Sequence, residues 1–131
     1  ELGTVHSLVV HGEPGMDEIS PLAPSTIVEI RGHDVRRWTF DPADVGVRDV
    51  AAADLAGGEP AQNALVIERV LMGKAPKGAE HAVVLNAGAA LYVGGAAASL
   101  PEGVLLARAA LEDGRGWDAL GRLRTATASR R

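Results

Sequence analysis

Residues 82–101 form a run of 20 residues without a single charged side chain. A run of this length is about what a membrane-spanning helix needs. Its commonest residue is alanine, however, which contributes much less transfer free energy than leucine or isoleucine, and Asn86 and the pair Gly94-Gly95 interrupt it. We therefore predict a central, buried helix over about residues 80–93 that ends at Gly94.

The composition changes at about residue 50. Residues 1–50 contain eight valines and two alanines, whereas residues 51–131 contain six valines and 21 alanines. Valine favours strands and alanine favours helices, so we predict a strand-rich segment over 1–50 followed by a helical segment over 51–131. A chain of 131 residues with 47% apolar and 23% charged residues is long enough for one domain with its own core, and wholesale disorder is excluded.

Charge and cysteine content exclude several classes of protein. The chain has 13 basic and 17 acidic residues, so it lacks the positive field that attracts nucleic acids or anionic membranes. We expect no nucleic-acid partner and no membrane association. The absence of cysteine excludes disulfides, thiolate metal sites and thiol nucleophiles, and it suits the cytoplasm. No signal-peptide pattern follows Glu1.

Three strands are predicted in the first segment. The short β-branched run at 5–10 is typical of a buried strand that leads into a loop. Residues 26–30 and 35–40 flank a turn-like link at 31–34 that carries Gly and Asp, which indicates an antiparallel hairpin. The pair Asp41-Pro42 should end the last strand, because proline cannot donate to the sheet.

Four helices are predicted in the second segment, the central one included. The first covers about residues 60–72 and ends near Gly73. The third opens at Ser99, where Glu102 completes a capping-box pattern, and ends at Gly114. A fourth follows, and its tail at 125–131 is expected to fray. The apolar residues at helical spacing are Ala64, Ile67 and Leu71 on the first helix and Trp117, Leu120 and Leu123 on the fourth.

Most motif searches are negative. The chain has no glycine-rich dinucleotide or phosphate loop, no nucleophile elbow and no zinc-protease motif. We expect Asn86 and Tyr92, on the apolar helix, to find hydrogen-bond partners in the core. Arg36 and Arg37 should point to opposite sides of a strand, as on a solvated edge. The histidines lack metal-ligand spacing on one element and are expected to be structural or exposed: His6, His11, His33 and His81.

One loop carries a chemically suggestive pair, Asp17-Glu18, directly after the first strand. Adjacent carboxylates on irregular backbone can turn toward one cation, and Mg²⁺ commonly takes one or two carboxylates together with waters and phosphate oxygens. An acidic pair in a loop is also compatible with a simple solvated charge pair. The spacing alone leaves both interpretations open.

Seven short segments along the chain form a recognisable set when they are taken in order. They are Leu2-Gly3, Val9-Val10-His11-Gly12, Gly15-Met16-Asp17-Glu18-Ile19-Ser20, Thr26 to Glu29, Gly57-Gly58-Glu59, Asn63-Ala64 and Leu85 to Val93. Together they resemble the C-terminal part of the anthranilate phosphoribosyltransferase family. The family's acidic signature usually has leucine where Met16 stands, and its glycine pair is usually followed by Asp where this chain has Glu59.

The resemblance implies both fold and activity. The fold would be the C-terminal portion of a phosphoribosyltransferase or nucleoside-phosphorylase-like α/β domain, with about three strands followed by about four helices. The reaction would transfer the phosphoribosyl group from phosphoribosyl pyrophosphate to anthranilate, which gives phosphoribosylanthranilate and pyrophosphate in tryptophan biosynthesis. Asp17 and Glu18 would be Mg²⁺ ligands, shared with waters and substrate oxygens, and neither would act as a general base. No catalytic residue is assigned within residues 1–131.

The resemblance also implies that other parts of the enzyme lie upstream of Glu1. These are an N-terminal helical domain that forms the homodimer, the first half of the α/β domain, and the main phosphate and anthranilate contacts. Residues 1–131 would then be inactive alone and would show an exposed apolar edge at Val5 to Val10. Two alternatives are a non-catalytic relative that binds nucleic acid or a protein partner, and a pyrimidine-nucleoside phosphorylase-like enzyme.

Overall fold

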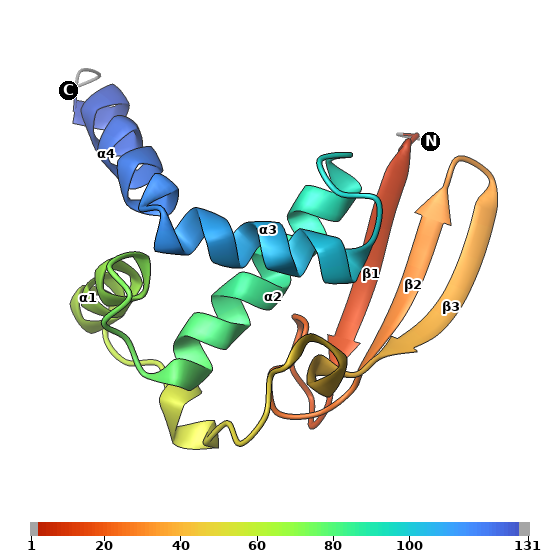
Figure 1. The fold of residues 1–131 in the computed structure, drawn as a ribbon, viewed down its shortest axis with the longest axis horizontal. Helices are drawn as coiled ribbons and strands as arrows, with labels where there is room; N and C mark the ends of the chain where they lie inside the picture. The colour runs from red at the N-terminus through yellow and green to blue at the C-terminus, as the bar shows by residue number, and fades with distance from the viewer. Residues whose placement is uncertain (1–2, 129–131) are drawn as a thin grey trace.

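A computed structural model describes residues 3–128 as a small antiparallel sheet with helices against one face (Figure 1). Three strands followed by four helices confirm the predicted fold class. Leu2, in the first of the segments that resemble the family, is outside the described residues. The elements are β1 (His6–Gly12), β2 (Ser25–Arg31), β3 (Asp34–Phe40), the short 3-10 helices η1 (Pro42–Val45) and η2 (Ala52–Leu55), α1 (Pro60–Leu71), α2 (Lys77–Val93), α3 (Leu100–Glu112) and α4 (Arg115–Ala128).

The sheet has the order β1-β2-β3, and both pairs are antiparallel. The β2–β3 hairpin was predicted, and its turn contains Gly32 at φ 56°. The sheet ends at Phe40 because Pro42 starts η1, which Asp41 caps through a 2.9 Å hydrogen bond from the Ala43 amide. The 3-10 helix η2 was not predicted from the sequence.

β1 lies at the edge of the sheet and is only half-buried, so the prediction of a buried strand is wrong. Within residues 3–128, no element covers its outer face. The exposed fractions of Val5 and Val9 are 90% and 60%, which confirms the predicted exposed apolar edge. A strand edge of this kind can pair with another chain.

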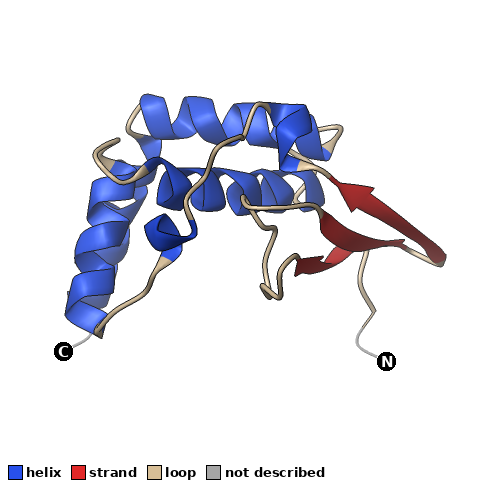
Figure 2. Ribbon diagram, turned by 90° about the horizontal axis from the view of Figure 1, so that it is seen from below, coloured by secondary structure: helices blue, strands red, loops and turns tan. Residues whose placement is uncertain are grey.

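The core lies between the sheet and the pair α2 and α3, as the edge-on view in Figure 2 shows. Alternate residues of β2, Ser25, Ile27 and Glu29, are buried toward the helices. Full burial of an aliphatic side chain such as Ile27 contributes about 1.5–3 kcal/mol to the free energy of folding. The buried cluster consists of Ile19, Ile27, Phe40, Val47, Val84, Leu85, Leu100, Val104 and Ala107.

The uncharged run forms the predicted helix, α2, which ends before Gly94 and begins at Lys77, three residues earlier than expected. Helix α2 packs mainly against α3, the next helix along the chain, and it also contacts β1 of the sheet (Figure 1). Within residues 3–128, no helix combines the length and the apolar character needed to cross a membrane.

The start of α3 differs in detail from the predicted capping box. Ser99 Oγ accepts a hydrogen bond from the Glu102 amide at 3.2 Å, as predicted. The Glu102 carboxylate instead accepts from the Ala98 amide, at 2.8 Å, so it caps one residue further back than a standard box. Gly114, at φ 75°, follows the end of the helix as expected.

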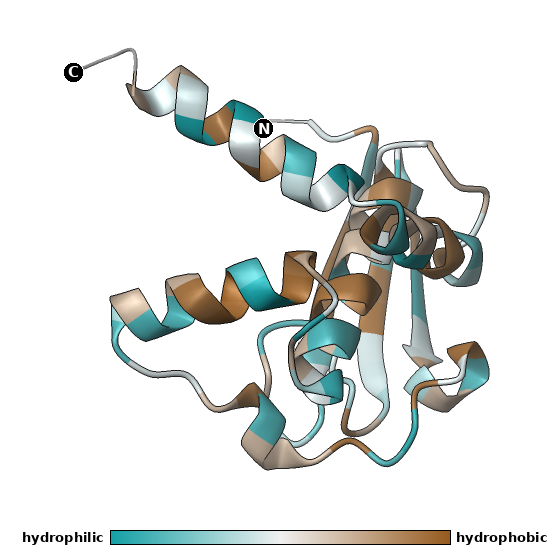
Figure 3. Ribbon diagram, turned by 60° about the vertical axis from the view of Figure 1, so that its left-hand side comes forward, coloured by the Kyte–Doolittle hydropathy of each residue, from teal (hydrophilic) through white to brown (hydrophobic). Residues whose placement is uncertain are grey.

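Helices α1 and α4 extend away from the sheet, as Figure 3 shows, and expose much of their apolar surface. The apolar residues of α1 are unevenly buried, since Ile67 is 54% exposed while Val70, about one turn away, is only 2% exposed. α4 continues to Ala128, so the prediction of fraying from residue 125 is wrong up to that point, and residues 129–131 lie outside the described chain. A Glu68–Arg124 ion pair joins the two helices.

Candidate functional site

The acidic pair lies in the loop that connects β1 to β2, and both Asp17 and Glu18 are exposed. The loop begins with a tight reversal of the chain. The Gly12 amide donates to the Met16 carbonyl at 2.9 Å, and the Met16 amide donates to the Gly12 carbonyl at 2.7 Å. The backbone is therefore fixed directly before Asp17.

Gly12 permits the loop to pass very close to the end of β1. A Cβ at this position would lie 2.6 Å from the Glu18 carbonyl oxygen and 2.7 Å from Ser20 Cβ. Both distances are far shorter than normal contacts. The Glu18 carbonyl oxygen is a backbone atom, so it cannot move aside unless the loop moves with it. Only glycine fits without a shift of the acidic loop.

The residue after the acidic pair, Ile19, is anchored in two ways. Its side chain is fully buried in the core. Its backbone is held by Asn86 of α2, whose Oδ1 accepts from the Ile19 amide at 2.9 Å and whose Nδ2 donates to the Ile19 carbonyl at 3.0 Å. This confirms the prediction that Asn86 hydrogen-bonds within the core, and it links α2 to the acidic loop.

The next residue, Ser20, is also fully buried. Its amide donates to Ser25 Oγ at 2.9 Å, and its own Oγ accepts from the Leu22 amide at 3.1 Å. Ser20 was noted only as the end of a matching segment and Ser25 was not noted, although two serines that flank a short proline-containing loop are a recognisable turn signal. The backbone is thus fixed on both sides of Asp17 and Glu18.

The carboxylates of Asp17 and Glu18 fit Mg²⁺ as two ligands of an incomplete coordination shell. Among residues 3–128, neither Asp17 nor Glu18 has a side-chain hydrogen bond or ion pair, so both carboxylates can accept a cation. No cluster of three or more His, Cys, Asp or Glu side chains is found in the same part of the chain. Two carboxylates alone do not complete a shell, and Mg²⁺ commonly takes its other ligands from water and phosphate oxygens.

A second polar cluster lies at the other end of the strands, around Glu29. Glu29 is 8% exposed and accepts from Tyr92 Oη at 2.5 Å, with His6 Nε2 at 3.0 Å and Arg31 Nε at 3.3 Å from the same oxygen. The Tyr92 hydrogen bond is the main cause that lowers the pKa of Glu29, against the opposing effect of burial. Burial, followed by Glu29, raises the pKa of Tyr92.

The Glu29 cluster confirms that Tyr92 has a hydrogen-bond partner and that His6 is structural. Sequence analysis missed Glu29 itself. The available signal was its position on β2, since Ser25, Ile27 and Glu29 share one face of an alternating strand. A carboxylate on the buried face of a strand needs partners.

The remaining histidines lie apart from one another. His11 is exposed near Glu13, at 3.9 Å, and His33 is exposed in the hairpin turn. His81 on α2 is partly buried, and burial, followed by the charge of Arg108, lowers its pKa. Arg36 and Arg37 are both exposed, and the register places them opposite Glu29 and Val28 on different faces, as predicted.

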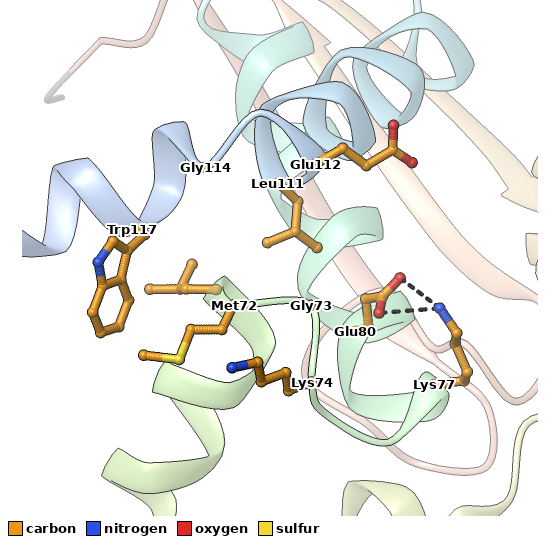
Figure 4. A pocket seen from close by; sticks show the side chains of 10 residues that line it. Met72, Gly73, Lys74, Lys77, Glu80, Leu111, Glu112, Gly114 and Trp117 are labelled. Carbon is orange, nitrogen blue, oxygen red and sulfur yellow. Dashed lines mark hydrogen bonds and ion pairs between the residues drawn. The ribbon is translucent and has the colours of Figure 1, made fainter.

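The cavity drawn in Figure 4 lies where the four helices meet, away from the acidic loop. It has a volume of about 520 Å³. Lys77 points toward Glu80 and donates to both of its oxygens, at 3.2 and 3.3 Å, so this lysine is already paired (Figure 4). Trp117 of α4 lines the opposite wall.

An antiparallel sheet with helices packed on one face is a common layered architecture of protein domains. The chain belongs to the glycosyl transferase family, since residues 1–117 match the family's α/β domain. Only α4 extends substantially beyond the matched segment.

The chain is also similar to individual members named anthranilate phosphoribosyltransferase. It is 45% identical over 124 residues to the one from Maricaulis maris, which covers 94% of this chain and 36% of that protein. It is 42% identical over 122 residues to the one from Shewanella baltica, with 93% and 34% covered. The chain thus spans about a third of the length of the curated relatives it matches.

Solved structures show the same similarity. The crystal structure of anthranilate phosphoribosyltransferase from Thermus thermophilus matches with a TM-score of 0.78 and 38% identity, over 89% of this chain and 34% of that one. The Saccharomyces cerevisiae enzyme in complex with PRPP and Mg matches with a TM-score of 0.79, over 93% of this chain and 35% of that one. Its identity is only 21%, so this second match supports the fold alone.

Proposed function

We propose that residues 1–131 form the C-terminal part of an anthranilate phosphoribosyltransferase, whose helical domain and first half of the α/β domain lie upstream. The complete enzyme transfers the phosphoribosyl group of phosphoribosyl pyrophosphate to the amine of anthranilate and releases pyrophosphate, in tryptophan biosynthesis. The observation that carries the proposal is the 45% identity over 124 residues to a protein of that name. We also propose that the enzyme is a cytoplasmic homodimer.

In this proposal Asp17 and Glu18 are ligands of Mg²⁺, with waters and substrate oxygens in the remaining positions. Departure of pyrophosphate builds negative charge on phosphate oxygens, and bound Mg²⁺ supplies charge that stabilises this leaving group. The role of the chain is to hold two carboxylates at the end of β1 on backbone that is fixed before and after them. Neither carboxylate acts as a general base, and the principal contacts to both substrates lie upstream of Glu1.

The test is to replace both carboxylates in the full-length enzyme, with Asp17→Asn and Glu18→Gln. Turnover at limiting Mg²⁺ should fall by roughly 100-fold or more, because the variant removes ligands and not merely their supports. The fold should be intact, since exposed side chains without partners contribute little to stability. Glu13→Gln, which changes an exposed carboxylate in the same loop, is the matched control and should retain turnover. Unchanged turnover of the double variant at limiting Mg²⁺ would exclude the metal assignment.

The two alternatives give different results with the same full-length protein. A pyrimidine-nucleoside phosphorylase-like enzyme would consume thymidine with phosphate and leave anthranilate untouched. A non-catalytic relative would turn over neither substrate, and salt-sensitive binding of single-stranded oligonucleotides in fluorescence anisotropy would identify a nucleic-acid binder. The net charge of −4 argues against that outcome.

A further inference from the structure

Asn86 is the side chain through which α2 hydrogen-bonds to the acidic loop, and it lies 67 residues away from Ile19 in the sequence. We propose that Asn86 is a positioning residue, which sets the direction of the Asp17 and Glu18 carboxylates and thereby the affinity of the loop for a divalent cation. The proposal rests on the proposed function, because it takes these carboxylates to be metal ligands.

The hydrogen bonds of Asn86 determine the orientation of its amide. Nδ2 donates to the Ala82 carbonyl of its own helix at 2.9 Å as well as to the Ile19 carbonyl at 3.0 Å, while Oδ1 accepts from the Ile19 amide at 2.9 Å. A flipped amide would place a donor against the Ile19 amide and an acceptor against two carbonyls. The bond to Ala82 therefore fixes the side chain on α2, and the other two bonds fix Ile19 relative to that helix.

The position of these bonds matters for Glu18. The amide of Ile19 belongs to the peptide group that follows Glu18. The hydrogen bond that this amide donates to Asn86 Oδ1 therefore fixes the orientation of that peptide plane. The buried side chain of Ile19 keeps the loop against the core, but a single anchored side chain still permits the backbone to rotate about it. The two hydrogen bonds between Asn86 and the Ile19 backbone prevent this rotation one residue after Glu18.

The loop is held equally firmly before the acidic pair. Met16 is hydrogen-bonded to Gly12 through both of its backbone groups, and the Glu18 carbonyl oxygen lies only 2.6 Å from where a Cβ on Gly12 would be. Asp17 and Glu18 are therefore the only two residues between one backbone anchor at Met16 and another at Ile19. A change in either anchor must change how the two carboxylates face a shared cation.

A purely structural role for Asn86 also predicts a loss of stability when it is replaced, so stability alone cannot test the proposal. The discriminating quantity is metal affinity, measured against a variant that is destabilised elsewhere. Val70→Ala is a suitable control, because Val70 is 2% exposed and lies on α1, away from the acidic loop. The informative variants are Asn86→Ala, which removes all three bonds, and Asn86→Asp, which keeps the size and the acceptor but loses both donated bonds.

The experiment uses the full-length enzyme with each variant. Mn²⁺ binding is measured by electron paramagnetic resonance in the presence of pyrophosphate, and turnover is measured as a function of Mg²⁺ concentration. For Asn86→Ala, the Mn²⁺ Kd and the half-saturating Mg²⁺ concentration should rise by roughly 10- to 100-fold, as is typical when a residue that supports metal ligands is lost. Excess Mg²⁺ should largely restore kcat. Asn86→Asp should raise both quantities by an intermediate factor. Because it keeps the volume of the native side chain, it still tests the proposal if Asn86→Ala does not fold.

Three outcomes separate the proposals. If Asn86→Ala binds Mn²⁺ as Val70→Ala does, while replacement of Asp17 and Glu18 weakens binding, the positioning role is wrong and the metal assignment stands. If replacement of Asp17 and Glu18 has no effect either, the metal assignment fails and the positioning proposal fails with it. If kcat of Asn86→Ala falls and excess Mg²⁺ does not restore it, Asn86 is structural only.

Discussion

Gly103 of α3 packs directly against Gly88 of α2, so closely that a Cβ at Gly103 would lie 2.2 Å from the Gly88 carbonyl oxygen. The contact is reciprocal, since a Cβ at Gly88 would lie 2.6 Å from the Val104 amide nitrogen. The two helices therefore meet backbone to backbone. Asn86, which holds the acidic loop, lies only two residues from this contact, so the Gly88–Gly103 contact also locates the helix that supports the candidate site.

We predict that Gly103→Ala lowers the free energy of unfolding by about 1–3 kcal/mol, because the helices must separate to admit a methyl group. Urea denaturation monitored by circular dichroism measures the change. Gly121→Ala is the control: Gly121 lies within α4 with no atom near its Cβ position, and the exchange should raise stability by about 0.5–1 kcal/mol. Equal effects of the two substitutions would show that the close contact does not constrain the helices.

Gly12→Ala is expected to displace the acidic loop. The new Cβ would lie 2.6 Å from the Glu18 carbonyl oxygen, so the backbone that carries both carboxylates must shift. We predict a loss of about 1–3 kcal/mol in the free energy of unfolding together with weaker Mn²⁺ binding. Gly121→Ala again supplies the control. Native Mn²⁺ affinity in a folded Gly12→Ala protein would mean that the loop position is not critical for the metal.

Local patterns predicted the elements well, but they failed where burial depends on distant neighbours. Alternation and turn residues were enough for the β2–β3 hairpin, and uncharged length was enough for α2. The stripe through Ile67 is equally periodic, yet Ile67 is 54% exposed because nothing among residues 3–128 packs over that side of α1. Periodicity reports which side of a helix is apolar, and it does not report what covers that side.

In the candidate site, too, local features could be predicted from the sequence and long-range contacts could not. Asp17 and Glu18 could be singled out because residue type and loop context are local properties. The need of Asn86 for a core partner was also predictable, but its partner Ile19 was not, since the pair is 67 residues apart and forms only once α2 packs on the sheet. Gly88 offered no local signal of a helix contact, because its role depends on Gly103 of another helix.

The cap of α3 leads to a third prediction. Ser99 Oγ accepts from the Glu102 amide, and loss of such a cap costs about 0.5–2 kcal/mol, so Ser99→Ala should destabilise the protein by that amount. Urea denaturation provides the measurement. Ser99→Asp retains an acceptor and is expected to keep most of the stability, so a loss as large as that of Ser99→Ala would contradict the capping role.

The pH dependence of stability should show two separate steps on the acid side. Burial lowers the pKa of His81 below its ordinary 6.5, so the neutral form is favoured in the folded protein. The contribution of neutral His81 to the free energy of unfolding is fully present above pH 6.5, and it is lost as the pH falls through the lowered pKa. His81→Asn should remove this step and leave the second one unchanged in urea denaturation measured across the pH range.

The second acid step belongs to Glu29, whose pKa the Tyr92 hydrogen bond holds below 4.5. The charged form is favoured in the folded protein, so its contribution is complete above pH 4.5 and is lost as the pH falls through the lowered pKa. Tyr92→Phe removes the main cause of the shift, and the stability difference between wild type and this variant should shrink as the pH drops below 4.5. On the alkaline side the same difference should shrink above pH 10.0, because burial and Glu29 raise the pKa of Tyr92 and favour the neutral phenol. A difference that stays constant across both ranges would show that the Tyr92–Glu29 hydrogen bond does not couple the ionisation of these two side chains to folding.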